Sequence, residues 1–342
     1  MIRPRVFVVQ PVYEEALREL RRVSDVEVFP HVDRMMRKDE LIAAVRRNDC
    51  LFTLGDTVID AEIINANPDL RIVATMAIYP TTVDIDAATA RNIPVTCIPN
   101  MVVEATADLA MGLLLAVAWR IPEADAYTRA GHFRQEQSMA FICPQLHHRT
   151  LGIVGLGAIG RLIANRVRGF DMRVLYTKRT RLAADEEAAL SVEWRELDGV
   201  MTESDYVVLA PTLTADSMSL IRERELSLMK PSAYLINISR GRIVDEEALI
   251  QALEAGYIAG AGLDVFNDEP PLSEPNPDPR LLKMRNVVLT PHIGTATKAL
   301  RIDMARTVAE NVMAVIKGGR APNVVNPQVY GEPAPPPAER IG

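Results

Sequence analysis

Three polar residues with complementary chemistry, Arg240, Glu269 and His292, each follow a short apolar run typical of a strand. Reduction of a 2-oxo acid needs a cation for the carboxylate, a proton donor for the carbonyl oxygen, and a group that keeps this donor charged. A guanidinium matches the planar carboxylate. Imidazole transfers a proton near neutral pH, and a neighbouring carboxylate favours its charged form. Alone, each residue has a structural alternative, as a strand cap, a surface turn residue or a core histidine.

A glycine-rich loop directly follows the apolar run Leu151–Val154 and opens the amphipathic segment Arg161–Arg168. Its residues are Gly155, Leu156, Gly157, Ala158, Ile159 and Gly160. In a strand, turn and helix of this kind, the first glycine allows the tight turn and the second lets a pyrophosphate approach the backbone. The third lets helix and strand pack closely. Free N–H groups at the helix start favour phosphates, so the loop predicts a dinucleotide site.

The end of the next predicted strand indicates which dinucleotide binds. An NAD site places Asp or Glu there for the ribose 2′-hydroxyl, whereas this chain has only Asp171, at the opposite end of the strand. The strand is instead followed by Lys178, Arg179, Thr180 and Arg181. These cations and the hydroxyl can pair with a 2′-phosphate. We therefore predict NADP(H) as the preferred cofactor and NAD(H) as the second choice, with a solvated basic turn as the alternative.

Apolar runs rich in Val and Ile alternate with helix-period segments along the chain, which is typical of parallel strands with crossover helices. The length of 342 residues favours two domains. We predict an α/β protein with two doubly wound parallel-sheet domains, Rossmann-like or flavodoxin-like, and an interdomain cleft. Strands are expected at 5–9, 26–29, 51–54, 71–75 and 94–97, and then at 151–154, 173–176, 206–209, 234–238, 258–263 and 287–289. Residues 109–119 predict a buried helix, and residues 128–149 an arm or long loop.

The composition excludes several classes of protein. A net charge of −7 without a basic cluster argues against nucleic-acid binding. The N-terminus lacks the features of a signal peptide, and no apolar run reaches the roughly 20 residues of a membrane span. Three scattered cysteines and an adjacent histidine pair suggest neither disulfides nor a metal site, so a cytoplasmic protein is expected.

Four further motifs support a resemblance to a known family. They are Ile238-Ser239-Arg240-Gly241, Val244-Asp245-Glu246, Gly262-Leu263-Asp264-Val265-Phe266 with Glu269-Pro270, and Pro291-His292-Ile293-Gly294. Together with the glycine loop, the chain resembles the D-isomer-specific 2-hydroxyacid dehydrogenases from about Arg5 to Asn326. Within that family it is most similar to glyoxylate/hydroxypyruvate reductases.

The resemblance implies roles for further residues. His292 would be the general acid, Glu269 its partner and Arg240 the substrate anchor, with Asp264 beside the nicotinamide. The cofactor would also contact Thr106, Pro211, Thr212, Ile238 and Gly294. It implies a discontinuous substrate-binding domain, 1–101 plus 296–330, a dinucleotide-binding domain, 102–295, and a homodimer. The Pro- and Gly-rich tail, 331–342, is expected to be disordered.

One loop departs from the family. Family members cradle the substrate carboxylate with backbone N–H groups of a Val-Gly pair, whereas this chain has Ile78, Tyr79 and then Pro80, which has no N–H to donate. Ile78 and Tyr79 are the expected substrate contacts. The leading hypothesis is an NADPH-preferring reductase of glyoxylate and hydroxypyruvate that forms D-2-hydroxy acids. The alternatives are the same chemistry on another 2-oxo acid and a dinucleotide-sensing, corepressor-like binding protein.

Overall fold

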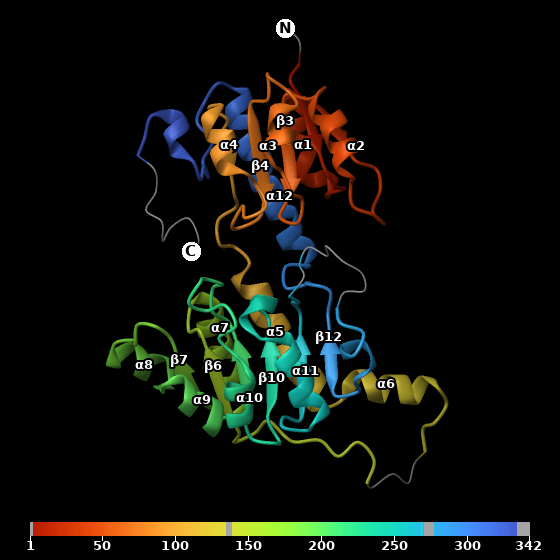
Figure 1. Cartoon of the computed structure of the whole chain (residues 1–342), viewed down its shortest axis with the longest axis vertical. Helices are drawn as coiled ribbons and strands as arrows, with labels where there is room; N and C mark the ends of the chain where they lie inside the picture. The colour runs from red at the N-terminus through yellow and green to blue at the C-terminus, as the bar shows by residue number, and fades with distance from the viewer. Residues whose placement is uncertain (1–2, 135–138, 268, 270–276, 334–342) are drawn as a thin grey trace. The chain divides into compact units, whose positions relative to one another are not determined.

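A computed structural model describes residues 3–134, 139–267, 269 and 277–333. The chain divides into two compact units, each of which is an α/β structure (Figure 1). Unit 1 combines Met1–Met101 with Ala296–Gly342, and unit 2 is Val102–Thr295. Most of the tail expected to be disordered, 334–342, lies outside the described residues.

Unit 1 contains a five-stranded parallel sheet of order β2-β1-β3-β4-β5. Its elements are β1 (Arg5–Val8), α1 (Glu14–Val23), β2 (Asp25–Val28), α2 (Lys38–Val45), β3 (Cys50–Leu54), α3 (Ala61–Asn65), β4 (Ile72–Met76), α4 (Ile85–Ala90), β5 (Val95–Thr96) and α12 (Lys298–Ile316). Strands β3 and β4 are covered on both faces, which is why their sequences are nearly continuous apolar runs. Helix α12 returns from the end of the chain and packs against α1, β4 and β3.

Unit 2 contains a seven-stranded parallel sheet of order β12-β11-β10-β9-β6-β7-β8. Its elements are α5 (Val103–Ala118), α6 (Ile121–Arg129), β6 (Thr150–Val154), α7 (Ala158–Val167), β7 (Arg173–Thr177), α8 (Ala184–Leu190), β8 (Val192–Trp194), α9 (Leu197–Glu203), β9 (Tyr206–Leu209), α10 (Glu223–Leu228), β10 (Tyr234–Asn237), α11 (Glu246–Glu254), β11 (Gly260–Leu263) and β12 (Val287–Leu289). The strand order reverses between β6 and β9, as in a doubly wound sheet. The predicted fold class of two parallel α/β domains is confirmed.

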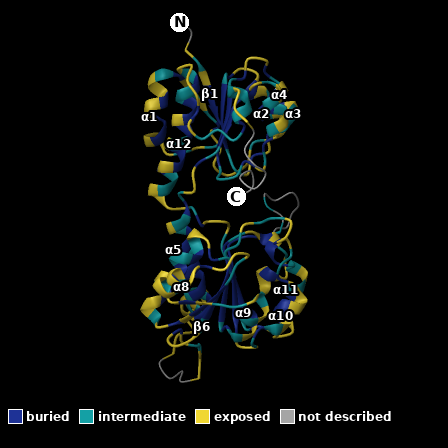
Figure 2. Ribbon diagram, turned by 90° about the vertical axis from the view of Figure 1, so that its left-hand side faces the viewer, coloured by how far each residue is buried: buried dark blue, intermediate teal, exposed yellow. Residues whose placement is uncertain are grey.

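Buried residues concentrate on the strands of each sheet (Figure 2), and apolar side chains of strands and helices form the cores. Helix α5 supplies Leu113 and Leu114 to the core of unit 2 and packs against β10 and β11. Gly262 on β11 permits this packing, because a Cβ atom there would lie 3.2 Å from Leu113 Cβ. The predicted buried helix at 109–119 is therefore confirmed, and it begins earlier, at Val103.

No single helix of the described residues is long and apolar enough to cross a membrane. Helices α5 and α6, which are bent by 60° relative to one another, pass that test of length and composition only as a pair.

Three elements differ from the sequence-based expectation. Strand β8 adds a seventh strand at the sheet edge, and helix α4 follows β4 in unit 1. Helix α6 extends into the predicted arm and includes its first two residues, Thr128 and Arg129, whereas residues 130–134 and 139–149 contain neither helix nor strand. Each missed element is short and leaves few residues buried, so its hydrophobic pattern is weak.

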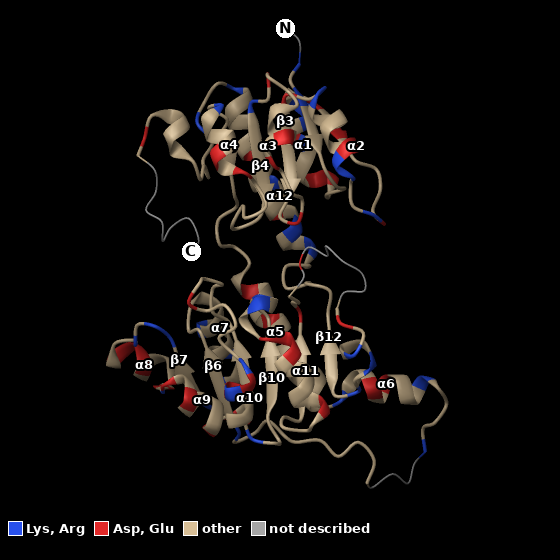
Figure 3. Ribbon diagram, viewed as in Figure 1, with Lys and Arg blue, Asp and Glu red and all other residues tan. Residues whose placement is uncertain are grey.

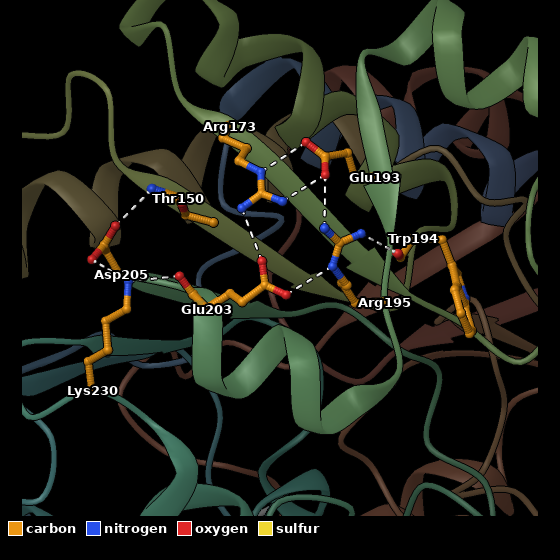
Figure 4. A network of polar contacts seen from close by, with 8 residues as sticks. All are labelled: Thr150, Arg173, Glu193, Trp194, Arg195, Glu203, Asp205 and Lys230. Carbon is orange, nitrogen blue, oxygen red and sulfur yellow. Dashed lines mark hydrogen bonds and ion pairs between the residues drawn. The ribbon is translucent and has the colours of Figure 1, made fainter.

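Charged side chains of both signs are interspersed over both units (Figure 3). A concentrated example joins the starts of β6, β7 and β9 with β8 (Figure 4). Arg173 pairs with Glu193 at 2.7 Å and with Glu203 at 3.0 Å, and Arg195 pairs with the same two carboxylates at 3.0 and 2.9 Å. Arg173 and Glu203 lie where β7 and β9 begin, at the edge of the sheet opposite the loop that follows β6.

Candidate active site

His292 and Glu269 are in direct contact at the carboxyl edge of the unit 2 sheet. Strands β11 and β12 are paired, so the loops that follow them emerge side by side. His292 Nδ1 is hydrogen bonded to Glu269 Oε2, and Glu269 Oε1 accepts a hydrogen bond of 2.6 Å from the Phe266 N–H. Glu269 is mostly shielded, with 22% of its side chain exposed, whereas His292 is 46% exposed. The carboxylate therefore fixes the ring through Nδ1 and leaves Nε2 as the nitrogen that can donate a proton.

Asp264 organises the turn that carries His292. Asp264 is buried, with 1% of the residue exposed. Its carboxylate accepts hydrogen bonds from Thr290 Oγ1 at 2.6 Å, Ile293 N–H at 2.8 Å and Gly294 N–H at 2.9 Å. Burial raises the pKa of Asp264, while the same hydrogen bonds oppose the rise. His292 has φ +51°, a left-handed conformation that costs energy for a residue with a Cβ atom. The buried carboxylate supplies the contacts that hold this turn.

Arg240 follows β10, the neighbour of β11, and its side chain is exposed. The Asn237 side chain shapes the turn, because its Nδ2 donates to the Arg240 carbonyl at 3.0 Å and its Oδ1 accepts from Ser239 N–H at 3.1 Å. Gly241 is required here, since a Cβ atom would lie 1.9 Å from the Phe266 carbonyl carbon. The turn of Arg240 thus packs on the loop that carries Glu269. Within the described residues, the Arg240 guanidinium donates to the Ser239 carbonyl at 2.8 Å and forms no hydrogen bond or ion pair with Glu269 or His292.

The glycine loop lies between β6 and α7, at the point where the strand order reverses. Gly155 has φ +93°, and a Cβ atom there would lie 2.5 Å from the Pro211 nitrogen. A Cβ atom on Gly160 would lie 2.6 Å from the Gly155 carbonyl oxygen, so this glycine permits close packing of α7. By contrast, a Cβ atom on Gly157 would meet nothing within 4 Å. Leu156 is buried in the core, and Ala158 and Ile159 begin α7. The tight turn at Gly155, the open space beside Gly157 and the close packing at Gly160 together fit the binding of a dinucleotide pyrophosphate.

The basic turn after β7 contains one cation that is held in an ion pair with the described residues and two that are not. Arg181 is held by Glu187 at 2.8 Å, and this carboxylate also accepts a hydrogen bond of 2.6 Å from Tyr176 Oη. In the described part of the chain, Lys178 and Arg179 form no ion pair or side-chain hydrogen bond. Lys178 is half-buried, and both Arg179 and Thr180 are exposed. Arg181 therefore has a structural role, whereas Lys178 and Arg179 are available to a phosphate.

The remaining residues expected near the cofactor lie on α5 and in the segments that follow β9, β10 and β12. Pro211 and Thr212 follow β9, and the Pro211 carbonyl accepts a hydrogen bond from Ser239 Oγ. Thr106 Oγ1 donates to the Val102 carbonyl at 3.0 Å and lies 3.3 Å from the Gly294 carbonyl oxygen. Ile238 is buried in the hydrophobic core. Thr106 and Gly294 therefore belong to the same part of unit 2 as the His292 turn.

Ile78 and Tyr79 lie in unit 1, in the loop that follows β4, and both are half-buried. The loop is tied to its neighbours by hydrogen bonds from Ile98 N–H to the Ala77 carbonyl and from Val83 N–H to the Pro80 carbonyl. Among the described residues, the N–H groups of Ala77 and Ile78 donate to no protein group. Two backbone donors of the loop thus remain available to an anion despite the proline.

Sequence reasoning missed the residues that hold the site together. Asn237 and Thr290 anchor the turns of Arg240 and Asp264, and the backbone of Phe266 anchors Glu269. Only the polar character of the positions next to the strand ends could have indicated them. No group of three or more potential metal ligands occurs among the residues that the structure describes.

Comparisons with known proteins agree with this geometry. Residues 111–294 match the model of the D-isomer specific 2-hydroxyacid dehydrogenase, NAD binding domain. The glyoxylate reductase of Thermococcus gammatolerans is 43% identical over 332 residues, which cover 96% of this chain and 97% of the relative. The glyoxylate reductase of Pyrococcus furiosus is 42% identical over the same shares of the two chains.

Solved structures give the same result. A protein of Thermus thermophilus superposes with a TM-score of 0.85 at 38% identity and covers 94% of this chain and 99% of its own. The NADPH-dependent glyoxylate/hydroxypyruvate reductase of Sinorhizobium meliloti, solved with NADP and malonate, has a TM-score of 0.75 at 32% identity, with 94% and 97% covered. The chain therefore belongs to the D-isomer specific 2-hydroxyacid dehydrogenase family and is an NAD(P)-dependent oxidoreductase.

Proposed function

We propose that this protein reduces small 2-oxo acids, with glyoxylate and hydroxypyruvate as first candidates, to D-2-hydroxy acids and prefers NADPH. The observation that carries the proposal is the hydrogen bond between His292 and Glu269 beside the turn of Arg240. This arrangement offers a cation for a carboxylate and an oriented proton donor for a carbonyl oxygen. A neutral core histidine or a solvated surface pair would not need such a supported turn.

The nicotinamide, when bound, supplies the hydride that is added to the keto carbon. Arg240 binds the substrate carboxylate through its planar guanidinium, which fixes the orientation of the adjacent carbonyl. His292 Nε2 donates its proton to the carbonyl oxygen, so that the product is a hydroxyl group rather than an alkoxide. Glu269 holds the imidazole in place through its contact with Nδ1. Asp264 maintains the turn on which His292 depends.

NADPH preference rests on the turn after β7. A 2′-phosphate offers charge-assisted hydrogen bonds to Lys178, Arg179 and Thr180, none of which is committed to another side chain of the described residues. No carboxylate in this turn would accept a ribose 2′-hydroxyl. The related reductase of Sinorhizobium meliloti is NADPH-dependent and was solved with NADP.

The substrate proposal rests on two observations. The relatives that match nearly the whole chain are glyoxylate reductases. In addition, the N–H groups of Ala77 and Ile78 are available to a carboxylate, and the phenol of Tyr79 in the same loop favours a small acid. We assign unit 1 to the substrate and unit 2 to the dinucleotide on this basis.

We further propose a cytoplasmic homodimer. Large apolar side chains are exposed at the end of α5, on α6 and in the predicted arm, namely Trp119, Ile121, Phe133, Met139 and Ile142. Exposed apolar side chains of this size are typical of a surface that is covered by a partner. The three cysteines, Cys50, Cys97 and Cys143, are unpaired, which suits a reducing compartment.

An absorbance assay at 340 nm tests the function directly. NADPH and NADH would each be combined with glyoxylate, hydroxypyruvate, pyruvate and phenylpyruvate. We expect rapid oxidation of NADPH with the two small acids, slower oxidation of NADH, and D-glycerate as the product from hydroxypyruvate. Faster turnover of phenylpyruvate than of glyoxylate would contradict the substrate assignment. The absence of turnover with every acid, while NADPH still binds, would contradict the reductase assignment.

A further inference from the structure

Arg301, in the first turn of α12, is a cation that the proposed chemistry does not use. It is half-buried, and within the described chain it is the one half-buried arginine whose guanidinium forms neither an ion pair nor a hydrogen bond. Burial lowers the pKa of Arg301, because the charged group loses part of its hydration. A guanidinium carries five N–H donors. The Arg301 guanidinium is therefore partly desolvated, and no hydrogen bond or ion pair with the described residues offsets the lost hydration.

The contacts of α12 place Arg301 within unit 1. The helix packs against α1, β3 and β4. Lys298 lies about one helical turn before Arg301. Its Nζ lies 5.6 Å from the centre of the Tyr13 ring and 3.8 Å from Glu15 Oε1. The Asp56 carboxylate and the Tyr13 side chain both lie near Arg301, and the carboxylate favours its charged form. Tyr13 lies after β1 and Asp56 after β3, so Arg301 is close to the segments that follow these two strands.

These two strands mark a special point of the sheet. The order β2-β1-β3-β4-β5 reverses its direction between β1 and β3. In open parallel sheets, ligands bind outside the carboxyl ends of the strands at such a reversal. Helix α12 begins at the end of the sheet to which β3 points (Figure 1). Asp56, the carboxylate whose charge acts on Arg301, is exposed and forms no ion pair with it.

We propose that Arg301 is a second cation for the carboxylate of the 2-oxo acid, in addition to Arg240, and thereby contributes to the affinity for substrate. The inference rests on the proposed function and deepens it. A carboxylate would satisfy the guanidinium in the planar, bidentate geometry that arginine favours. Arg301 is thus a specificity-determining residue for an anionic substrate.

The variants Arg301→Met and Arg301→Lys test the proposal, with Arg18→Met as matched control. Arg18 lies on α1 of the same unit, is exposed, and has no ion pair among the described residues. We expect Arg301→Met to raise the KM for glyoxylate by about 10- to 100-fold, the effect of losing a charged hydrogen bond. The kcat and the KM for NADPH should change much less. Arg301→Lys should recover part of the loss, and Arg18→Met should behave like the wild-type protein.

Two further measurements separate this role from a structural one. Without ligand, Arg301→Met should melt no lower than the wild-type protein, because it removes an unpaired charge. Oxalate, a carboxylate that cannot be reduced, should bind the wild-type protein in calorimetry with NADPH present and bind Arg301→Met at least about tenfold more weakly.

An unchanged KM in Arg301→Met, a lower melting temperature, or failure of the variant to fold would overturn the proposal, as would wild-type protein that does not bind oxalate. If oxalate binds through Arg301 but no 2-oxo acid is reduced, the reductase function fails and the anion site stands.

Discussion

The backbone N–H of His292 donates a hydrogen bond of 2.9 Å to the carbonyl oxygen of Asp264, one strand away. The Asp264 carboxylate binds the two N–H groups that follow His292, so one residue holds the turn from both sides. The family resemblance had implied only that Asp264 lies beside the nicotinamide. The structure adds a positioning role, because the left-handed backbone of His292 depends on these contacts.

Asp264→Asn should therefore impair catalysis without unfolding the protein. An amide cannot replace both carboxylate oxygens, so at least one of the donors from Thr290, Ile293 and Gly294 loses its acceptor. The loss of such a bond costs about 1–3 kcal/mol, which corresponds to a decrease of about 10- to 100-fold in kcat/KM. Steady-state kinetics with glyoxylate would measure this decrease. Thr290→Val removes only one donor and should have a smaller effect; an Asn variant with wild-type kinetics would show that the turn does not need the carboxylate.

His292→Ala tests the general acid. We expect kcat to fall by about 10²- to 10⁴-fold, because the carbonyl oxygen then receives its proton from water. NADPH binding, measured by calorimetry, should change little. Glu269→Gln keeps the shape of the pair but removes its charge, so its effect on kcat should be smaller. A loss of less than about tenfold in His292→Ala at its pH optimum would reject the assignment.

The sheets and the basic turn after β7 show which features could be predicted from the sequence and which could not. The alternation of apolar runs and helices was sufficient for both sheets, because buried parallel strands are apolar along their whole length. The same pattern failed for β8, an edge strand of three residues in which only Val192 is buried. Sequence also could not distinguish Arg181 from its neighbours. Its partner, Glu187, lies on α8, and only the folded chain brings the two together.

Replacement of Lys178 and Arg179 by Gln should change cofactor preference. Because both side chains lack a protein partner among the described residues, we expect a similar stability but a dissociation constant for NADPH that rises by about 10- to 100-fold. The constant for NADH should change by less than about threefold. Arg181→Gln is the matched control: it breaks the pair with Glu187, so it should lower the melting temperature and leave the NADPH/NADH ratio nearly unchanged. Equal losses for both cofactors in the double variant would rule out a 2′-phosphate site.

Two glycines of the loop, Gly155 and Gly157, should respond differently to a single added methyl group. Gly157→Ala places its Cβ in open space, so the protein should fold normally while the methyl group obstructs the pyrophosphate. Gly155→Ala combines a positive φ with a contact of 2.5 Å to Pro211, so it should lower the melting temperature. Thermal unfolding with and without NADPH distinguishes these effects. Strong stabilisation of Gly157→Ala by NADPH, equal to that of the wild-type protein, would contradict the proposed binding mode.

The site residues at the carboxyl edge could be predicted because they are polar residues that follow predicted strands. The residues that hold them in place could not be predicted. Asp264 and its three donors are 26 to 30 residues apart in the chain, and no local pattern connects them. The same holds for the contact of Gly241 with Phe266, which depends on the pairing of β10 with β11. Residues that act on the substrate can be recognised in the sequence by their type. Residues that position them are identified only once the register of the strands is known.

The ion-pair network at the opposite edge of unit 2 should make stability depend on acid (Figure 4). Hydrogen bonds from Arg173 lower the pKa of Glu193, and hydrogen bonds from Arg195 lower the pKa of Glu203. A carboxylate whose pKa is lower in the folded than in the unfolded protein stabilises the fold above the unfolded value of 4.5. This contribution disappears as the pH falls through the folded value. Because the pairs are well exposed, each contributes at most about 1 kcal/mol.

Urea unfolding of the wild-type protein and of Glu203→Gln at several pH values would measure this contribution. At pH 7 the variant should be less stable by about 1 kcal/mol, and the difference should shrink to near zero as Glu203 of the wild-type protein becomes protonated in both states. High salt should reduce the difference at pH 7 because it screens exposed charges. Kinetics with glyoxylate should be unaffected, since the network lies away from the carboxyl edge. A difference in stability that persists unchanged at low pH would show that Glu203 acts through packing rather than charge.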